Sequence, residues 1–121
     1  MKVQRAADNP PGPMDGSHFS GDVTRRELGT FDAPAATLLS VTFPAGARTH
    51  WHRHPDGQFL YVTAGRARVG TRDGAIAEVN VGDVVHAPPH EEHWHGAATD
   101  EAATHLAVSL GETEWLEEVT D

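Results

Sequence analysis

Cysteine is absent from this 121-residue sequence, and basic residues are few, with nine lysines and arginines against eighteen aspartates and glutamates. Without cysteine there can be no disulfide, no thiolate metal ligand and no cysteine nucleophile, so any metal must be bound by nitrogen and oxygen atoms. The net charge of −9 argues against nucleic acid or an anionic membrane as a partner, because basic surfaces bind both. We therefore expect a small-molecule substrate.

Long apolar runs are also missing. The first residues, Met1–Asp8, do not have the apolar run of a signal peptide, and no segment reaches the ~20 apolar residues that span a bilayer. We therefore expect a soluble, cytoplasmic protein. The length and the 38% hydrophobic content fit one domain with a core of its own.

Proline, glycine and aspartate dominate the start of the chain, as in the run Asn9–Pro13. Such a composition predicts an extended N-terminal arm over residues 1–20, with the folded domain over residues 21–121. An arm of this kind is suited to docking on a neighbouring subunit, and sheet edges are open to pairing. We therefore expect a homodimer or a homotetramer.

Short segments rich in β-branched and apolar residues fill the rest of the sequence, separated by turn residues. Asp73-Gly74 between two such segments is a strong hairpin signal, and Ala64-Gly65 also predicts a turn. The pattern predicts an all-β barrel or jelly roll. The tail Glu112–Val119 is expected to form one or two helical turns. The predicted strands are Asp22–Leu28, Ala36–Phe43, Thr49–His54, Gln58–Thr63, Arg66–Thr71, Ala75–Val79, Asp83–Ala87 and Thr104–Leu110.

Histidines gather at two places in the sequence. On one strand His52 and His54 point the same way, with Cα atoms about 6.5 Å apart, which suits a single ion. Gln58 follows a Pro-Asp-Gly turn and can bring its amide oxygen to the same point, while His93 must arrive from a distant strand. A closed sheet would join the four donors, so the sequence predicts a metal site.

The spacing of Gly46, His52, His54, Gln58 and Gly65 resembles the first motif of the cupin superfamily, with Gln58 where glutamate is usual. The resemblance implies a single-domain double-stranded β-helix, or jelly-roll barrel. Gly82, Pro88 and His93 resemble the second motif, which here departs from the usual pattern at His90 and Ala97, where glycine and asparagine are usual.

A longer match resembles the small bacterial manganese cupins with hydroxynitrile lyase activity. The resemblance implies a metal held by His52, His54, Gln58 and His93, and a substrate pocket lined by Thr49 and His105. The match covers Pro44–Thr49, His52, His54–Pro55, Gly57–Gln58, Val62–Gly65, Gly82–Val85, His93–Ala98 and Thr104–Ala107.

Three imidazoles and an amide are all uncharged, so a divalent ion at this site would keep its full positive charge and act as a strong Lewis acid. Nitrogen and oxygen donors suit Mn²⁺, Fe²⁺, Co²⁺, Ni²⁺ or Zn²⁺, and ligand type alone does not choose among them. Of these we expect manganese, on the resemblance. Such an ion can bind a substrate hydroxyl or carbonyl oxygen and stabilise an alkoxide.

His105 is the first candidate for general acid or base, because the alignment with the family points it at the metal. Strand alternation from His52 selects His50 as the other pocket residue, whereas the resemblance selects Thr49. A bulge near Thr49 would reconcile the two, so we favour Thr49 and keep His50 as a candidate. His95 fits either the pocket or a structural hydrogen bond to the backbone.

The resemblance implies cleavage or formation of cyanohydrins, and we expect the metal to hold the oxygen while His105 and Thr49 handle the proton and the cyanide. Other metal cupins carry out dioxygenation, isomerisation or sugar-acid chemistry with the same ligands. A non-catalytic module that binds a metal or a small molecule is the alternative from a different class. Loss of activity under nitrogen would indicate a dioxygenase, and a closed pocket would indicate the binding module.

Overall fold

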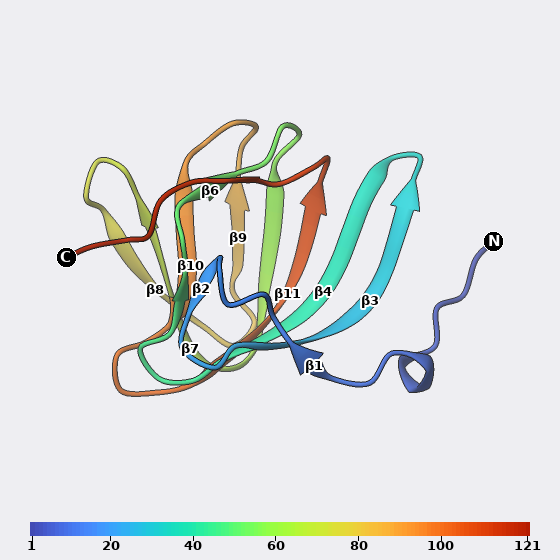
Figure 1. Ribbon diagram of the computed structural model, residues 1–121, viewed down its shortest axis with the longest axis horizontal. Helices are drawn as coiled ribbons and strands as arrows, with labels where there is room; N and C mark the ends of the chain where they lie inside the picture. The colour runs from blue at the N-terminus through green and yellow to red at the C-terminus, as the bar shows by residue number, and fades with distance from the viewer.

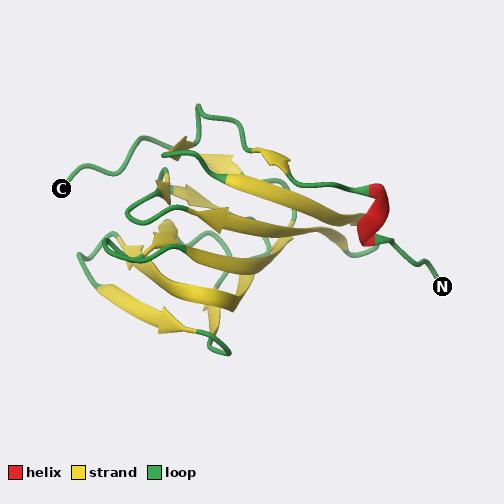
Figure 2. Cartoon of the chain, turned by 90° about the horizontal axis from the view of Figure 1, so that it is seen from below, coloured by secondary structure: helices red, strands yellow, loops and turns green.

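The computed structural model describes all residues, 1–121, and confirms the all-β prediction (Figure 1). Outside the strands there is one short 3-10 turn, η1 (Ala6–Asp8), which lies at the N-terminal end in Figure 2. The strands are β1 (Gly12–Pro13), β2 (Phe19–Ser20), β3 (Thr24–Asp32), β4 (Ala35–Phe43), β5 (Arg48–Thr49), β6 (His52–Arg53), β7 (Gln58–Thr71), β8 (Ile76–Asn80), β9 (Val84–Ala87), β10 (His93–Ala97), β11 (Ala103–Leu110) and β12 (Glu114–Trp115).

The long strand β7 joins two halves of a curled sheet. Its first half pairs with β11 and β9, and its second half pairs with β10 and β8. The chain of neighbours runs β1-β3-β4-β11-β7-β10-β5-β2, while β6 lies between β10 and β12. Antiparallel pairing throughout places segments that are far apart in the sequence side by side around one interior.

Gly65 is the point where β7 passes from one half of the sheet to the other. The prediction of a turn at Ala64-Gly65 is wrong, because the strand continues through it with a left-handed φ of +70° at Gly65. A Cβ at this position would clash with the carbonyl oxygen of Ala102. The glycine is therefore a bend within a strand, where sequence alone indicates an interruption.

The hairpin predicted at Asp73-Gly74 is confirmed, since β7 and β8 pair across it. His93 was expected on a distant strand, but the extent of β10 was not predicted, because all of its five residues are buried and no alternation of polar and apolar residues marks it as a strand. The helical tail is wrong: Glu114 and Trp115 pair instead with Arg53 and His52 of β6. In this arrangement the acidic side chain of Glu114 forms an ion pair with Arg53 on the neighbouring strand.

The N-terminal arm packs against its own chain. β1 pairs with β3 and β2 pairs with β5, and Phe19 is buried in the same apolar cluster as Val41, Phe43 and Val62. Phe43 has no exposed surface. This apolar cluster fills one part of the interior, and buried histidines occupy the part beside β6 and β10.

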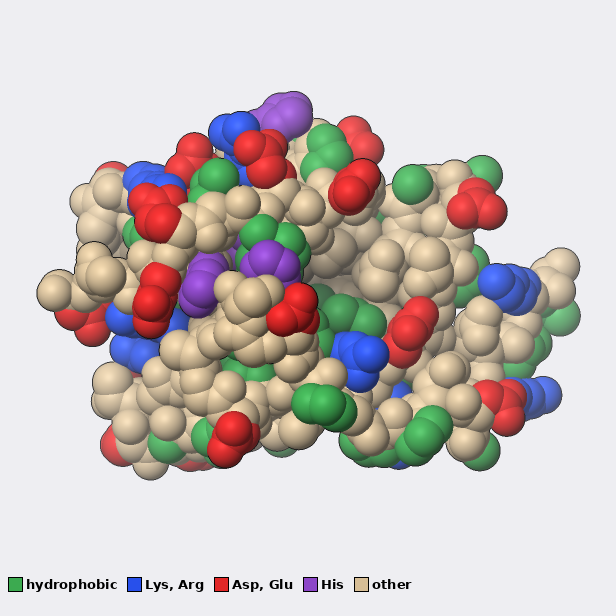
Figure 3. All heavy atoms as spheres, in the orientation of Figure 1, with side chains coloured by type: hydrophobic (Ala, Val, Ile, Leu, Met, Phe, Trp, Pro, Cys, Tyr) green, Lys and Arg blue, Asp and Glu red, His purple; other side chains and the backbone are tan.

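Charged side chains are scattered over the surface, and Figure 3 shows acidic groups across the whole face that it presents. Several acids in the tail and near it pair with arginines, as Glu114 does with Arg53 and Glu117 with Arg72. No helix in the structure has the length and the apolar character needed to cross a membrane.

Candidate metal centre

Three neighbouring strands and the segment that follows one of them bring the predicted metal ligands together. His52 in β6 lies opposite His93 in β10, His54 follows β6, and Gln58 opens β7. All four side chains are buried, with 1%, 2%, 3% and 5% exposure for His52, His54, Gln58 and His93. The ring centres of His52 and His93 are 4.4 Å apart, and those of His52 and His54 are 5.0 Å apart. The predicted donors thus converge in one buried cluster.

Backbone carbonyls fix the orientation of two of these rings. The Nδ1 of His52 donates to the carbonyl of His50 over 3.0 Å, and the Nδ1 of His93 donates to the carbonyl of Glu91 over 2.9 Å. A carbonyl can only accept, so in each neutral ring the proton is on Nδ1 and the lone pair is on Nε2. Such an outer hydrogen bond is the usual support of a metal-binding histidine.

Side chains play the same part for the other two donors. The Nδ1 of His54 lies 3.2 Å from the hydroxyl of Thr113, while its buried Nε2 has no hydrogen-bond partner. The amide nitrogen of Gln58 donates to Ser109 over 3.0 Å, and its oxygen lies 2.9 Å from the Nε2 of His93. Two lone pairs that face each other and an orphaned ring nitrogen are what a cation would satisfy, so the residues fit a divalent ion.

Burial keeps these rings neutral, which is the form that binds a metal. It lowers the pKa of His52 well below the ordinary 6.5 and that of His54 to about 4, and the neighbouring His93 lowers both further. The pKa of His93 is also lowered, again chiefly by burial. At neutral pH protons therefore do not compete with a metal ion for the ring nitrogens of these three histidines.

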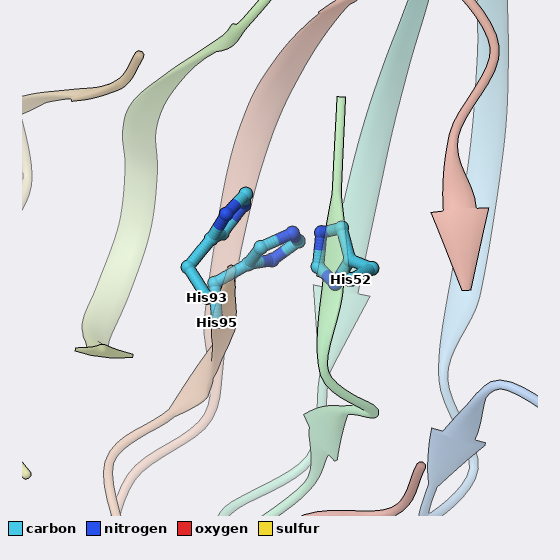
Figure 4. A group of neighbouring side chains, drawn as sticks. All are labelled: His52, His93 and His95. Atoms are coloured by element: carbon cyan, nitrogen blue, oxygen red, sulfur yellow. The ribbon is translucent and has the colours of Figure 1, made fainter. Parts of the chain in front are cut away.

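His95 belongs to the same cluster. Nitrogen atoms of His52, His93 and His95 all lie within 4.8 Å of one another, and Figure 4 shows His93 and His95 pointing from β10 toward His52. The backbone N–H of His95 donates to the hydroxyl of Thr49 over 3.2 Å. Of the two alternatives left open by the sequence, the structure places the His95 ring in the pocket wall.

His105 lies behind His95 rather than on the pocket surface. Its Nε2 is 2.8 Å from the Nδ1 of His95, and its own side chain is only 1% exposed. Burial lowers the pKa of His105 to about 4. His105, the predicted base, is therefore separated from the pocket by the imidazole of His95, and the sequence analysis did not predict His95 as the base.

Thr49 and His50 have separate positions because the strand is interrupted between them and His52. β5 ends at Thr49 and β6 begins at His52, and the two residues between them belong to neither strand. In a continuous strand Thr49 and His52 would point to opposite faces, but this interruption lets both side chains point to the interior. Thr49 is 1% exposed, with its hydroxyl 3.4 Å from the Nδ1 of His52. His50 is half-buried, and its carbonyl rather than its ring supports the site.

The pocket beside the histidines has one apolar wall, and both ends of the chain contribute to it. Phe19 of the arm and Trp115 of the tail pack against each other, with ring centres 5.5 Å apart, and Trp115 also lies 4.8 Å from His52. The sequence analysis did not assign Phe19 or Trp115 to a pocket; the lone tryptophan in an acidic tail was the available signal. The apolar lining comprises Met14, Phe19, Leu39, Val41, Ala107 and Trp115.

A curled β-sheet with a buried group of neutral histidines defines the class of small metal-binding β-barrels. The chain belongs to the cupin family, since the Cupin domain profile matches residues 39–109. It is 43% identical to an (R)-mandelonitrile lyase from Granulicella tundricola, in an alignment that covers 100% of this chain and 96% of the relative. The resemblance on which the sequence analysis relied is thus confirmed.

Solved structures agree on the fold. A cupin-like protein from Thermotoga maritima superimposes with a TM-score of 0.84 at 39% identity, over 90% of this chain and 86% of the other. The polyketide cyclase RemF from Streptomyces resistomycificus superimposes with a TM-score of 0.78 over 100% of this chain and 87% of the other. Its identity of 21% supports a likeness of fold alone.

Proposed function

We propose that this protein is a hydroxynitrile lyase that holds a divalent ion, manganese, on His52, His54, Gln58 and His93. The observation that carries the proposal is the buried set of uncharged donors, each with an outer hydrogen bond, of which His52, His54 and Gln58 line a partly apolar pocket. The lyase from Granulicella tundricola, to which the whole chain aligns, supports the choice of reaction. The ion, when bound, supplies Lewis acidity toward a substrate oxygen.

The reaction needs a group that takes the hydroxyl proton of the cyanohydrin and returns it to the departing cyanide. As the carbon–carbon bond breaks, its electron pair leaves with cyanide, the oxygen becomes the carbonyl of an aldehyde, and the proton completes hydrogen cyanide. We assign the proton transfer to His95, which faces the pocket, with His105 holding its ring through the 2.8 Å hydrogen bond. The Thr49 hydroxyl accepts a hydrogen bond from the backbone N–H of His95 and so positions the strand that bears His95.

The apolar wall selects the other part of the substrate. Phe19, Leu39, Val41 and Trp115 offer no hydrogen-bonding groups to the pocket apart from the indole N–H of Trp115. We therefore expect the best substrates to carry an apolar or aromatic substituent on the carbon that bears hydroxyl and nitrile.

Metal analysis combined with a cyanide-release assay on mandelonitrile tests this function. We expect purified protein to contain a divalent ion, to release cyanide, to lose this activity on chelation and to recover it when Mn²⁺ is added. If the protein retains an ion but releases no cyanide from aromatic or aliphatic cyanohydrins, the lyase proposal is contradicted, and a non-catalytic binding module becomes the favoured function. A reaction on other substrates that stops under nitrogen would instead indicate a dioxygenase.

A further inference from the structure

The Gln58 amide lies between two partners with different hydrogen-bonding capacities. On one side is the Nε2 of His93, 2.9 Å from the amide oxygen; on the other is the hydroxyl of Ser109, 3.0 Å from the amide nitrogen. The Nδ1–H of His93 already donates a hydrogen bond to the carbonyl of Glu91, so in the neutral ring Nε2 can only accept one. The amide oxygen therefore faces another acceptor.

That contact is stable only when a cation lies between or beside the two lone pairs. Without a cation, the opposite orientation of the amide is better, because its NH₂ then donates to the Nε2 of His93 and its oxygen faces Ser109. A serine hydroxyl has one proton and two lone pairs, so Ser109 can accept from the amide in one orientation and donate to it in the other. The chain thus provides for both states of Gln58 with a single side chain.

We infer that Ser109 is a positioning residue that selects the side of Gln58 presented to the centre. With an ion bound, Ser109 accepts the amide proton and leaves the oxygen directed inward. Without an ion, the amide turns by half a rotation about its last carbon–carbon bond, and the Ser109 hydroxyl rotates to donate. The inference deepens the proposed function, on which it rests through the ion at Gln58.

The surroundings favour this role for Ser109 over a contact with bulk solvent. Gln58 is 3% exposed and Ser109 lies directly opposite it in the pairing of β7 with β11. Loss of the hydroxyl would leave one polar group of the buried amide without a partner in either orientation. Removal of an outer hydrogen-bond partner of a metal ligand typically weakens metal binding about 10–100-fold.

Measurement of Mn²⁺ affinity by competition with a chelator tests the inference independently of turnover. We expect Ser109→Ala to weaken Mn²⁺ binding by about ten-fold or more. Ser109→Thr, which keeps the hydroxyl, should stay within about three-fold of the original protein, while Ser109→Val, with nearly the same shape, should match Ser109→Ala. Ser40→Ala removes a serine that lies between the pocket residues Leu39 and Val41 and so faces away from the pocket; it should change nothing.

A second readout follows the amide itself. The side-chain NH₂ resonances of Gln58 should shift when diamagnetic Zn²⁺ is added to the original protein, because the partner of that group changes from His93 to Ser109. If Ser109→Val folds and binds Mn²⁺ as tightly as Ser109→Thr, the inference is overturned while the metal site stands. If the original protein binds no divalent ion, both the inference and the proposed function fail; if it binds Mn²⁺ but releases no cyanide, only the lyase proposal fails.

Discussion

Two of the candidate ligands owe their orientation to the main chain and two to side chains. The carbonyls of His50 and Glu91 hold His52 and His93, so no side-chain substitution at those two positions removes the support. His54 instead depends on the hydroxyl of Thr113, from a segment near the end of the chain. The donors were predictable from their spacing, but these supports were not, because they depend on the register of strands that are distant in sequence.

The imidazole pair His95–His105 leads to a prediction at the same scale. With the metal retained, His95→Ala should reduce cyanide release by at least about 100-fold, because the group that faces the pocket is lost. His105→Ala should also reduce turnover, since the His95 ring loses its 2.8 Å partner. Steady-state rates with metal content measured on the same samples provide the check. Unchanged turnover in His105→Ala would remove that residue from the mechanism.

Burial of the histidines predicts how the stability of the metal-free protein depends on pH. Burial lowers the pKa of His52, His54, His93, His95 and His105 from the ordinary 6.5, to about 4 for His54 and His105. Between these values the unfolded chain binds more protons than the folded one, so the free energy of unfolding falls as pH decreases from about 6.5 toward about 4. Above about pH 6.5 these histidines should contribute no further pH dependence to the free energy of unfolding.

Urea unfolding of chelator-treated protein at pH 7.5, 6.5, 5.5 and 4.5 measures this dependence. His105→Gln should show a shallower loss of stability than the original protein, because one depressed pKa is gone. A flat profile between pH 6.5 and 4.5 would contradict neutral burial of these rings.

At the scale of elements, β7 shows what a local pattern can and cannot predict. The Asp73-Gly74 hairpin is a local feature and was predicted, whereas Gly65 looks like a turn residue but bends a continuous strand of 14 residues. Only the nearby carbonyl of Ala102, from a different segment, shows why a glycine stands there. The extent of β10 was not predicted for a different reason, because burial on both faces removes the alternation that marks a strand.

A pair of glycine variants tests the bend. Gly65 and Gly74 have left-handed φ values of +70° and +88°, but only Gly65 has backbone where a Cβ would lie; nothing is within 4 Å at Gly74. Gly74→Ala should cost about 1–2 kcal/mol for the backbone conformation alone. Gly65→Ala should cost more than about 3 kcal/mol, because the clash adds to that strain. Urea midpoints provide the comparison, and equal losses would show that the bend tolerates a side chain.

For the whole molecule, the pattern of short segments and turns predicted the all-β class and the absence of cysteine predicted nitrogen and oxygen donors, while the association state stays a prediction. Phe59 and Tyr61 of β7 and Val84 of β9 are 43%, 45% and 65% exposed, and Tyr61 pairs with Val84. β9 pairs with β7 alone, so its other edge is free. Adjacent exposed apolar groups at a free edge are typical of surfaces that associate, and a two-fold dimer would cover this patch with its own copy.

Light scattering at micromolar concentrations measures the association state. We expect a mass of two or four chains, and Val84→Lys should shift the protein toward the monomer by placing like charges opposite each other. Ile76→Lys, at an exposed apolar residue on β8, provides the matched control and should keep the original mass. A monomer in the original protein would contradict the prediction.

Met14 and Phe19 near the beginning of the chain and Thr113 and Trp115 near its end all border the same cavity. Terminal regions usually tolerate mutation and changes of length better than the interior does. Here changes at Met14 and Phe19 would reshape the space offered to a ligand, whereas a change at Thr113 would also remove the hydrogen-bond partner of His54. Length variation near either end of the fold should therefore alter the cavity, and near the C-terminal end it should alter the support of a candidate ligand as well.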